Sequence, residues 1–104
     1  MKTWDEMFQE MDPENQSEIE VIRERAAMVT ELIAIREHKG WTQDELARKV
    51  GMKQSAIARF EGGSTMPRMD TVLKIARALG VKMTFMPLGA GKEEAAAVYL
   101  GAYA

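Results

Sequence analysis

The chain has 104 residues, of which 46% are apolar and 29% are charged, a balance that is ordinary for one globular domain and argues against a wholly disordered chain. It has no cysteine and one histidine, which excludes disulfides and thiol catalysis and leaves little material for a metal site or a Ser-His-Asp triad. No apolar run is long enough to span a bilayer, and the acidic start does not have the pattern of a signal peptide. We therefore expect a cytoplasmic protein that is not an enzyme, with no metal, cofactor, small-molecule substrate or membrane partner.

The net charge of −2 conceals two regions of opposite sign. Residues 1–34 contain three basic and nine acidic residues, a net charge of −6, and residues 35–92 contain eleven basic and five acidic residues, a net charge of +6. A basic surface favours a phosphate backbone and an acidic arm favours a basic partner, although solvated surface is an equally good interpretation of charge alone.

Residues 1–16 are predicted to form an acidic amphipathic arm. Trp4, Met7, Phe8 and Met11 follow the i, i+3, i+4, i+7 spacing of one helix face, and Asp12-Pro13 interrupts that helix. Because so short a helix is marginal alone, the apolar stripe must be covered. It either docks on its own chain or binds a partner protein, and the sequence leaves both readings open.

Residues 17–80 are predicted to form one helical domain. Ser17 with Glu20 fits a capping box that begins a long helix, which ends near Lys39-Gly40. Three short helices follow, over Thr42–Val50, Gln54–Glu61 and Met69–Gly80, each bounded by capping or turn residues.

The segment from Thr42 to Glu61 has the layout of a helix-turn-helix, in which Gly51 supplies the turn. The outward face of its second helix carries Lys53, Gln54, Ser55 and Arg59, which are short, basic or hydrogen-bonding side chains. Such a face suits the major groove of DNA, where the bases display distinct donors and acceptors. The alternative is an ordinary surface helix of an all-helical bundle.

The stretch Trp41–Gly51, together with Ile57, Glu61-Gly62-Gly63, Pro67 and Ala78–Val81, resembles the lambda/434 repressor family, also called the xenobiotic-response-element type. This resemblance implies an all-α bundle of about five helices that binds double-stranded operator DNA as a homodimer. It also implies a phosphate contact for Gln43, base contacts for Gln54, Ser55 and Arg59, and a place at the groove margin for Lys53. Phosphate contacts are implied for Ser64, Thr65 and Arg68, and a structural salt bridge for Arg36 and Glu61.

Residues 81–88 are predicted to form one β-strand, because Val81, Met83 and Phe85 alternate with polar residues. One strand cannot satisfy its own backbone groups, so the expected partner is the same strand of a second copy. The function of the Ala-rich tail, residues 89–104, cannot be inferred from its sequence.

The strand after Ala78–Val81 and the acidic lead-in with Trp4–Phe8 are similar to antitoxins of type II toxin–antitoxin pairs, the HigA and HipB groups. A HigA-type role implies a small basic toxin that cleaves messenger RNA, of the RelE/HigB kind, and a bacterial, nucleoid-associated protein that represses its own operon. Two alternatives remain: a plain repressor of the same family without a toxin, and a pure protein-interaction module on the same scaffold.

Overall fold

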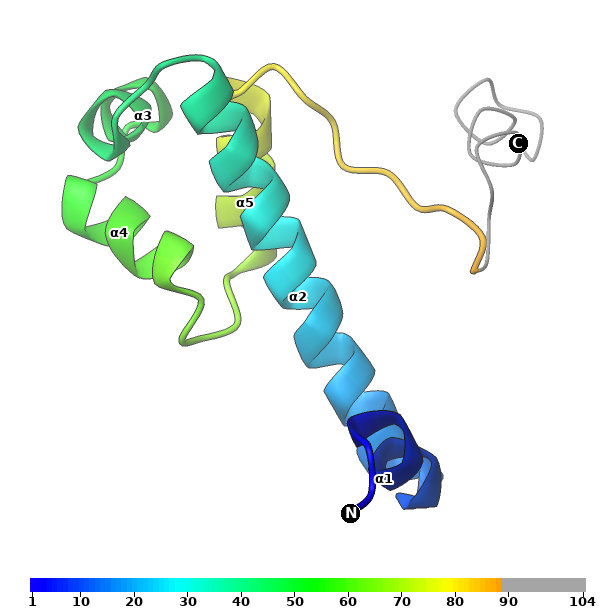
Figure 1. The fold of residues 1–104 in the computed structure, drawn as a ribbon. Coiled ribbons are helices and arrows are strands. Elements are labelled where there is room, and N and C mark those ends of the chain that lie inside the picture. Colours follow the sequence, from blue (N-terminus) through cyan, green and yellow to red (C-terminus); the bar gives the residue numbers. More distant parts are fainter. Residues whose placement is uncertain (89–104) are drawn as a thin grey trace.

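The computed structural model describes residues 1–88 and contains five α-helices in this order: α1 (Trp4–Glu10), α2 (Pro13–His38), α3 (Gln43–Val50), α4 (Gln54–Gly62) and α5 (Met69–Ala78). Helices α3, α4 and α5 gather around the C-terminal half of α2, while the other half of α2 extends away and carries α1 at its far end (Figure 1). The expected all-helical bundle is therefore confirmed. No helix within residues 1–88 combines the length and the apolar character needed to cross a membrane.

The core lies where these four helices meet. Leu46, Ile57, Ile75 and Leu79 are its largest fully buried side chains. On α2 the first buried residue is Val29, followed one turn later by Leu32. The first half of α2 therefore contributes no buried residue to the core. The remaining buried positions are Ala47, Phe60, Val72 and Ala76.

Local capping sets the bounds of the short helices. The Thr42 hydroxyl accepts a hydrogen bond from the backbone N–H of Glu45 at 3.1 Å, which satisfies one of the free donors at the start of α3. Gly51 ends α3 in the left-handed conformation, with φ of 81°, a region that costs other residues energy because of their Cβ.

The predicted start of the long helix is wrong. Helix α2 begins at Pro13, with Asp12 as its N-cap, so Ser17 lies inside the helix and forms no capping box there. The physical reason is that proline fits the first helical position well, since its missing N–H has no partner there in any helix. A capping box forms instead at α1, where Thr3 Oγ1 accepts from the Glu6 N–H at 3.2 Å.

Helix α1 folds back onto the start of α2. The Gln16 side chain donates to the backbone carbonyls of Phe8 at 2.8 Å and Met11 at 3.1 Å. The Arg23 guanidinium lies 5.5 Å from the ring centroid of Trp4 and 5.2 Å from that of Phe8, within range of a cation–π interaction. The apolar stripe thus docks in part on its own chain.

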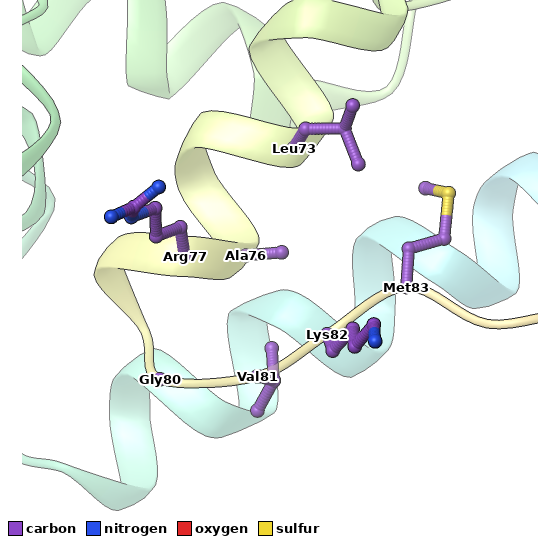
Figure 2. Close-up of a pocket in the computed structure, with 7 residues that line it drawn as sticks. All are labelled: Leu73, Ala76, Arg77, Gly80, Val81, Lys82 and Met83. Carbon is purple, nitrogen blue, oxygen red and sulfur yellow. The ribbon is translucent and has the colours of Figure 1, made fainter. Parts of the chain in front are cut away.

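The predicted strand over residues 81–88 is absent. The segment after α5 has no regular secondary structure. The Val81 N–H donates to the Ala76 carbonyl at 2.9 Å, but no second strand lies within residues 1–88 to pair with residues 82–88. Val81, Ala76, Leu73 and Met83 line a shallow groove beside α5, into which Met83 points from the departing chain (Figure 2). The expected tail, residues 89–104, lies outside the described residues.

Candidate nucleic-acid interface

Helices α3 and α4 form a rigid corner. Ala47 on α3 is buried, and its small side chain lets another helix cross close by. Ile57 on α4 is fully buried. The turn is closed by two hydrogen bonds to the Ala47 carbonyl, from the N–H groups of Gly51 and Met52, each 2.9 Å long. Because Ile57 and Phe60 face the core, the opposite side of α4 is directed outward.

The outward face of α4 carries the predicted reading residues. Gln54, Ser55 and Arg59 are exposed, and Lys53 is exposed at the N-cap position. Between Lys53 and Phe60 the chain has no acidic residue, and no ion pair within residues 1–88 involves Lys53 or Arg59. Two positive charges and two hydrogen-bonding side chains are therefore exposed on the outward side of α4.

A hydrogen-bonded network supports this face from below. Arg36 on α2 donates from Nε to Glu61 Oε2 at 2.7 Å and from Nη2 to Glu61 Oε1 at 3.0 Å, a two-pronged ion pair. The two side chains are 12% and 7% exposed, so the pair is almost excluded from water. The hydrogen bond that Arg36 donates to Glu61 raises the pKa of the Arg36 guanidinium, which stays charged.

The same network reaches the protein surface. Gln43, the first residue of α3, donates from Nε2 to Glu61 Oε1 at 3.0 Å. Gln54 in turn donates from Nε2 to Gln43 Oε1 at 2.8 Å. The pair of Arg36 with Glu61 was expected from the family resemblance. The bonds to Gln43 and Gln54 were not, because residues 11 and 18 positions apart carry no local signal of contact.

The loop after α4 borders the same face. Gly63 ends α4 in the left-handed conformation with φ of 67°, and Ser64 and Thr65 that come after it are exposed. Arg68, the N-cap of α5, has a side chain that is 84% exposed and forms an ion pair of 3.2 Å with Asp70. The charge of Arg68 is therefore partly offset, unlike that of Arg59.

The other predicted residues lie elsewhere. Helix α1 with Trp4, Met7, Phe8 and Met11 is at the end of α2 remote from α4 (Figure 1). Val81 and Phe85 are exposed, and Met83 is half-buried, on the segment that leaves α5. The structure thus separates three surfaces: the α4 face, the arm and the region around α5.

Comparison with known proteins identifies the fold family. The family model described as Helix-turn-helix matches residues 32–86, more than half of the chain. The chain belongs to this helix-turn-helix family. The match includes the corner of α3 and α4, and the arm precedes it.

Individual relatives extend the similarity. An uncharacterized HTH-type transcriptional regulator of Haemophilus influenzae is 38% identical over 85 residues, which cover 82% of this chain and 85% of that one. The antitoxin HipB of Escherichia coli O6:H1 is 39% identical over 62 residues, 60% of this chain and 66% of the relative. The antitoxin HigA1 of Mycobacterium tuberculosis is 32% identical over 72 residues, 69% of this chain and 48% of the relative.

A solved structure also resembles this helix-turn-helix protein. A chain of a toxin–antitoxin module from Streptococcus pneumoniae superposes with a TM-score of 0.59 at 35% sequence identity. The superposition covers 85% of this chain and 94% of that chain, so it extends beyond the residues that the family model matches.

Proposed function

We propose that this protein is a sequence-specific DNA-binding antitoxin, which represses its own operon and neutralises a small toxin. The observation that carries the proposal is the exposed, acid-free face of α4 on a rigid corner, in a chain similar to proteins named as antitoxins. The major groove of DNA admits a helix. There α4 would present the Arg59 guanidinium and the Gln54 amide to the edges of the bases. The protein then acts by binding alone and is not an enzyme.

The readout divides among the residues of the face. Arg59 can donate two hydrogen bonds to guanine, and Gln54 can pair with adenine, while Ser55 can bond either. Lys53, Gln43, Arg68 and the backbone N–H groups near Ser64 and Thr65 meet phosphates, which adds affinity and fixes the register without reading sequence.

Two copies are needed, because one corner offers few base contacts. A homodimer would set two α4 helices about 34 Å apart, one turn of DNA, on a nearly palindromic site. The region around α5 is the proposed contact between copies. Val81, Phe85 and Leu73 are exposed large apolar residues there, and Phe85 is 85% exposed.

The arm is the proposed toxin surface. Trp4 and Met7 remain 50% and 42% exposed although α1 docks on α2, and Val21 and Ile22 on α2 are exposed to a similar extent. With its net charge of −6, the region 1–34 complements a basic protein such as a RelE/HigB-like mRNA-cleaving toxin. Since α1 lies far from α4, toxin and DNA can be held at the same time.

The second candidate is a plain repressor of this family without a toxin. The bonds from Gln16 and the position of Arg23 over Phe8 favour it, because they give α1 a partner within its own chain. In that case the arm is a brace and binds nothing else.

Two experiments test the proposal. In gel shifts on the DNA upstream of the gene, Arg59→Ala should weaken binding about 5- to 100-fold, the range for one bidentate base contact. Lys2→Ala, which removes one exposed positive charge on the arm, is the control and should change affinity little. Equal effects of both variants would contradict readout by α4.

For the toxin, the product of the neighbouring gene is co-expressed and co-purified with the full chain. The double variant Trp4→Ala, Met7→Ala should lose the partner, while Met69→Ala, equally exposed on α5, should keep it. Binding that survives the double variant would show that the arm is not the toxin surface, whereas failure of the wild-type chain to retain the neighbouring gene product would favour the plain repressor.

A further inference from the structure

The side of α2 that faces the core continues along the first half of the helix, where no core covers it. This side carries, with the spacing i, i+3, i+4 and i+7, the residues Glu18, Val21, Ile22 and Arg25, and Val29 follows inside the bundle. These first four residues form the α2 stripe. Val21 and Ile22 in its middle are 50% and 51% exposed and line a shallow hollow. The α2 stripe thus has an apolar centre between an acid and a base.

Helix α1 does not cover the α2 stripe. Its contacts on α2 are made by Gln16 and Arg23, which precede Glu18 and Arg25 by two positions each. Two positions correspond to about 200° around an α-helix, so α1 packs on the opposite side of α2. Within residues 1–88 the α2 stripe is therefore left open, although it continues a face that is buried in the bundle.

Arg25 indicates what kind of group is missing from this face. Its Nε atom is buried and has no hydrogen-bond partner within residues 1–88, and no ion pair in that range involves Arg25 or Glu18. A buried donor without an acceptor is unfavourable, so a carboxylate from another molecule would stabilise it. The basic toxin proposed above complements the acids of this region but not Arg25. A second copy of the chain supplies Glu18 on the same stripe.

The α2 stripe is complementary to itself in one orientation. Glu18 lies three residues before Val21, and Arg25 lies three residues after Ile22. Two antiparallel copies related by a two-fold axis between Val21 and Ile22 therefore place Glu18 of each copy beside Arg25 of the other, with the apolar pair at the centre. In a parallel pair each charged residue would instead face its own copy, and like charges repel.

The charge distribution of the whole chain favours the same orientation. Residues 1–34 carry a net charge of −6 and residues 35–92 carry +6, and the arm and the bundle lie at opposite ends of α2 (Figure 1). Antiparallel α2 helices bring the acidic arm of each copy toward the basic bundle of the other. Parallel helices would align regions of the same sign, which is electrostatically unfavourable.

We propose that the α2 stripe is a self-association surface, which binds the α2 stripe of a second copy in antiparallel orientation through two ion pairs of Glu18 with Arg25. This contact is separate from the one proposed around α5, so a chain that uses both joins dimers into larger assemblies. The arm, on the other side of α2, stays free for a toxin. The contact requires neither DNA nor toxin, so its failure would leave the proposed function intact.

Because the chain has no cysteine, one introduced thiol reports this contact by disulfide formation. Val21→Cys places a thiol beside the two-fold axis, where the same residue of two copies comes close enough to be bridged. Ala27→Cys is the control, since Ala27 is exposed and follows Arg25 by two positions, on the opposite side of α2. Under air oxidation of the full chain, Val21→Cys should form dimers several times faster than Ala27→Cys. Equal rates would overturn the inference.

Charge reversal in the Val21→Cys chain tests the pairing. Glu18→Arg and Arg25→Glu each turn two attractions into two repulsions and should slow disulfide formation at least about fourfold, even at the low end of ion-pair strength. When the two variants are mixed, opposite charges meet at both ends of the stripe. The mixed dimer, identified by its mass, should then form within about twofold of the Val21→Cys rate. A mixture no faster than the separate variants would overturn the inference.

Two further measurements separate this contact from a folding defect and from a toxin surface. Both reversals in one chain restore the two ion pairs and should recover the rate, which a folding defect would not, and circular dichroism checks the helix content of each variant. If Val21→Cys shows no preference over Ala27→Cys and Ile22→Glu loses a co-purified neighbouring gene product, the α2 stripe belongs to the toxin surface and the inference is wrong.

Discussion

At the scale of single residues, Glu61 lies in the last turn of α4, where the negative end of the helix dipole disfavours an acid. Arg36 and Gln43 compensate, since together they donate three hydrogen bonds to the carboxylate. A buried charge of this kind is tolerable only with its partners in place. The stability of the bundle therefore depends on keeping these three donors in place.

Replacing Arg36 by methionine should lower the free energy of unfolding by about 3 kcal/mol, because Glu61 would be left buried with Gln43 alone. Urea denaturation followed by circular dichroism measures it. The exposed pair of Arg48 and Asp44 is the control, and Arg48→Ala should cost less than about 1 kcal/mol. Similar losses in both variants would mean that burial does not govern the strength of these pairs.

The pH dependence follows from the raised pKa of Arg36. A basic group whose pKa is higher in the folded state contributes stability below its unfolded pKa, and this is lost only as pH rises through the folded value. For an arginine that loss lies at strongly alkaline pH. The difference in unfolding free energy between wild type and Arg36→Met should therefore stay constant between about pH 6 and pH 9. A steady decline over that range would contradict the assignment.

At the scale of helices, the corner of α3 and α4 depends on backbone conformation and on one buried contact. Gly51 and Gly62 are both free of neighbours within 4 Å of an added Cβ, but only Gly51 has a positive φ. The two glycines therefore separate conformational cost from steric cost.

Gly51→Ala should destabilise the protein by about 1–2 kcal/mol, the cost of the left-handed conformation for a residue with a Cβ. Gly62→Ala, inside α4, should leave stability unchanged or raise it by up to about 1 kcal/mol, because alanine is the better helix former. Thermal unfolding of both variants checks the pair of values. Equal destabilisation would show that the turn does not require glycine.

Packing against the corner is tested by Ile57→Ala, which should cost about 2–5 kcal/mol, since Ile57 is fully buried. Ile22→Ala removes the same side-chain atoms, but it should lower the free energy of unfolding by less than about 1 kcal/mol. Ile22 is 51% exposed and lies on the half of α2 that extends away from the core. Chemical denaturation compares the two. A large loss at Ile22 would mean that the first half of α2 belongs to the core.

At the scale of the whole molecule, the packed bundle and the arm occupy opposite ends of α2 (Figure 1). The arm has no buried residue, and its contacts to α2 are a few hydrogen bonds and cation–π interactions. The described part of the molecule therefore consists of a packed helical bundle and an arm that contributes no residue to the core.

Removing residues 1–11 should change the melting temperature by less than about 4 °C, the shift that corresponds to roughly 1 kcal/mol in a domain of this size. Calorimetry of the truncated and full chains measures it, with Val29→Ala as a core substitution that should lower the melting temperature clearly. A comparable drop in the truncated chain would show that the arm stabilises the bundle.

The sequence by itself determined the features that arise from neighbouring residues. Helical periodicity gave the number and order of the helices, Thr42 and Gly51 gave the bounds of α3, and the motif spacing directed Ser55 and Arg59 outward. It misplaced the start of α2 at Ser17, because Pro13 fits the first helical position and begins the helix four residues earlier. It also predicted a strand over residues 81–88, since alternation signals strand geometry but cannot supply a partner.

The tertiary structure decided which other distant residues meet. The pair of Arg36 and Glu61 was anticipated from the family resemblance, but the bonds of Gln43 on α3 to Glu61, 18 positions away, and to Gln54, 11 positions away, were not. No periodicity or capping rule relates residues so far apart, because their contact depends on how α2, α3 and α4 pack around Ile57. The contacts of α1 with its own chain were decided in the same way, by the placement of Gln16 and Arg23 on α2.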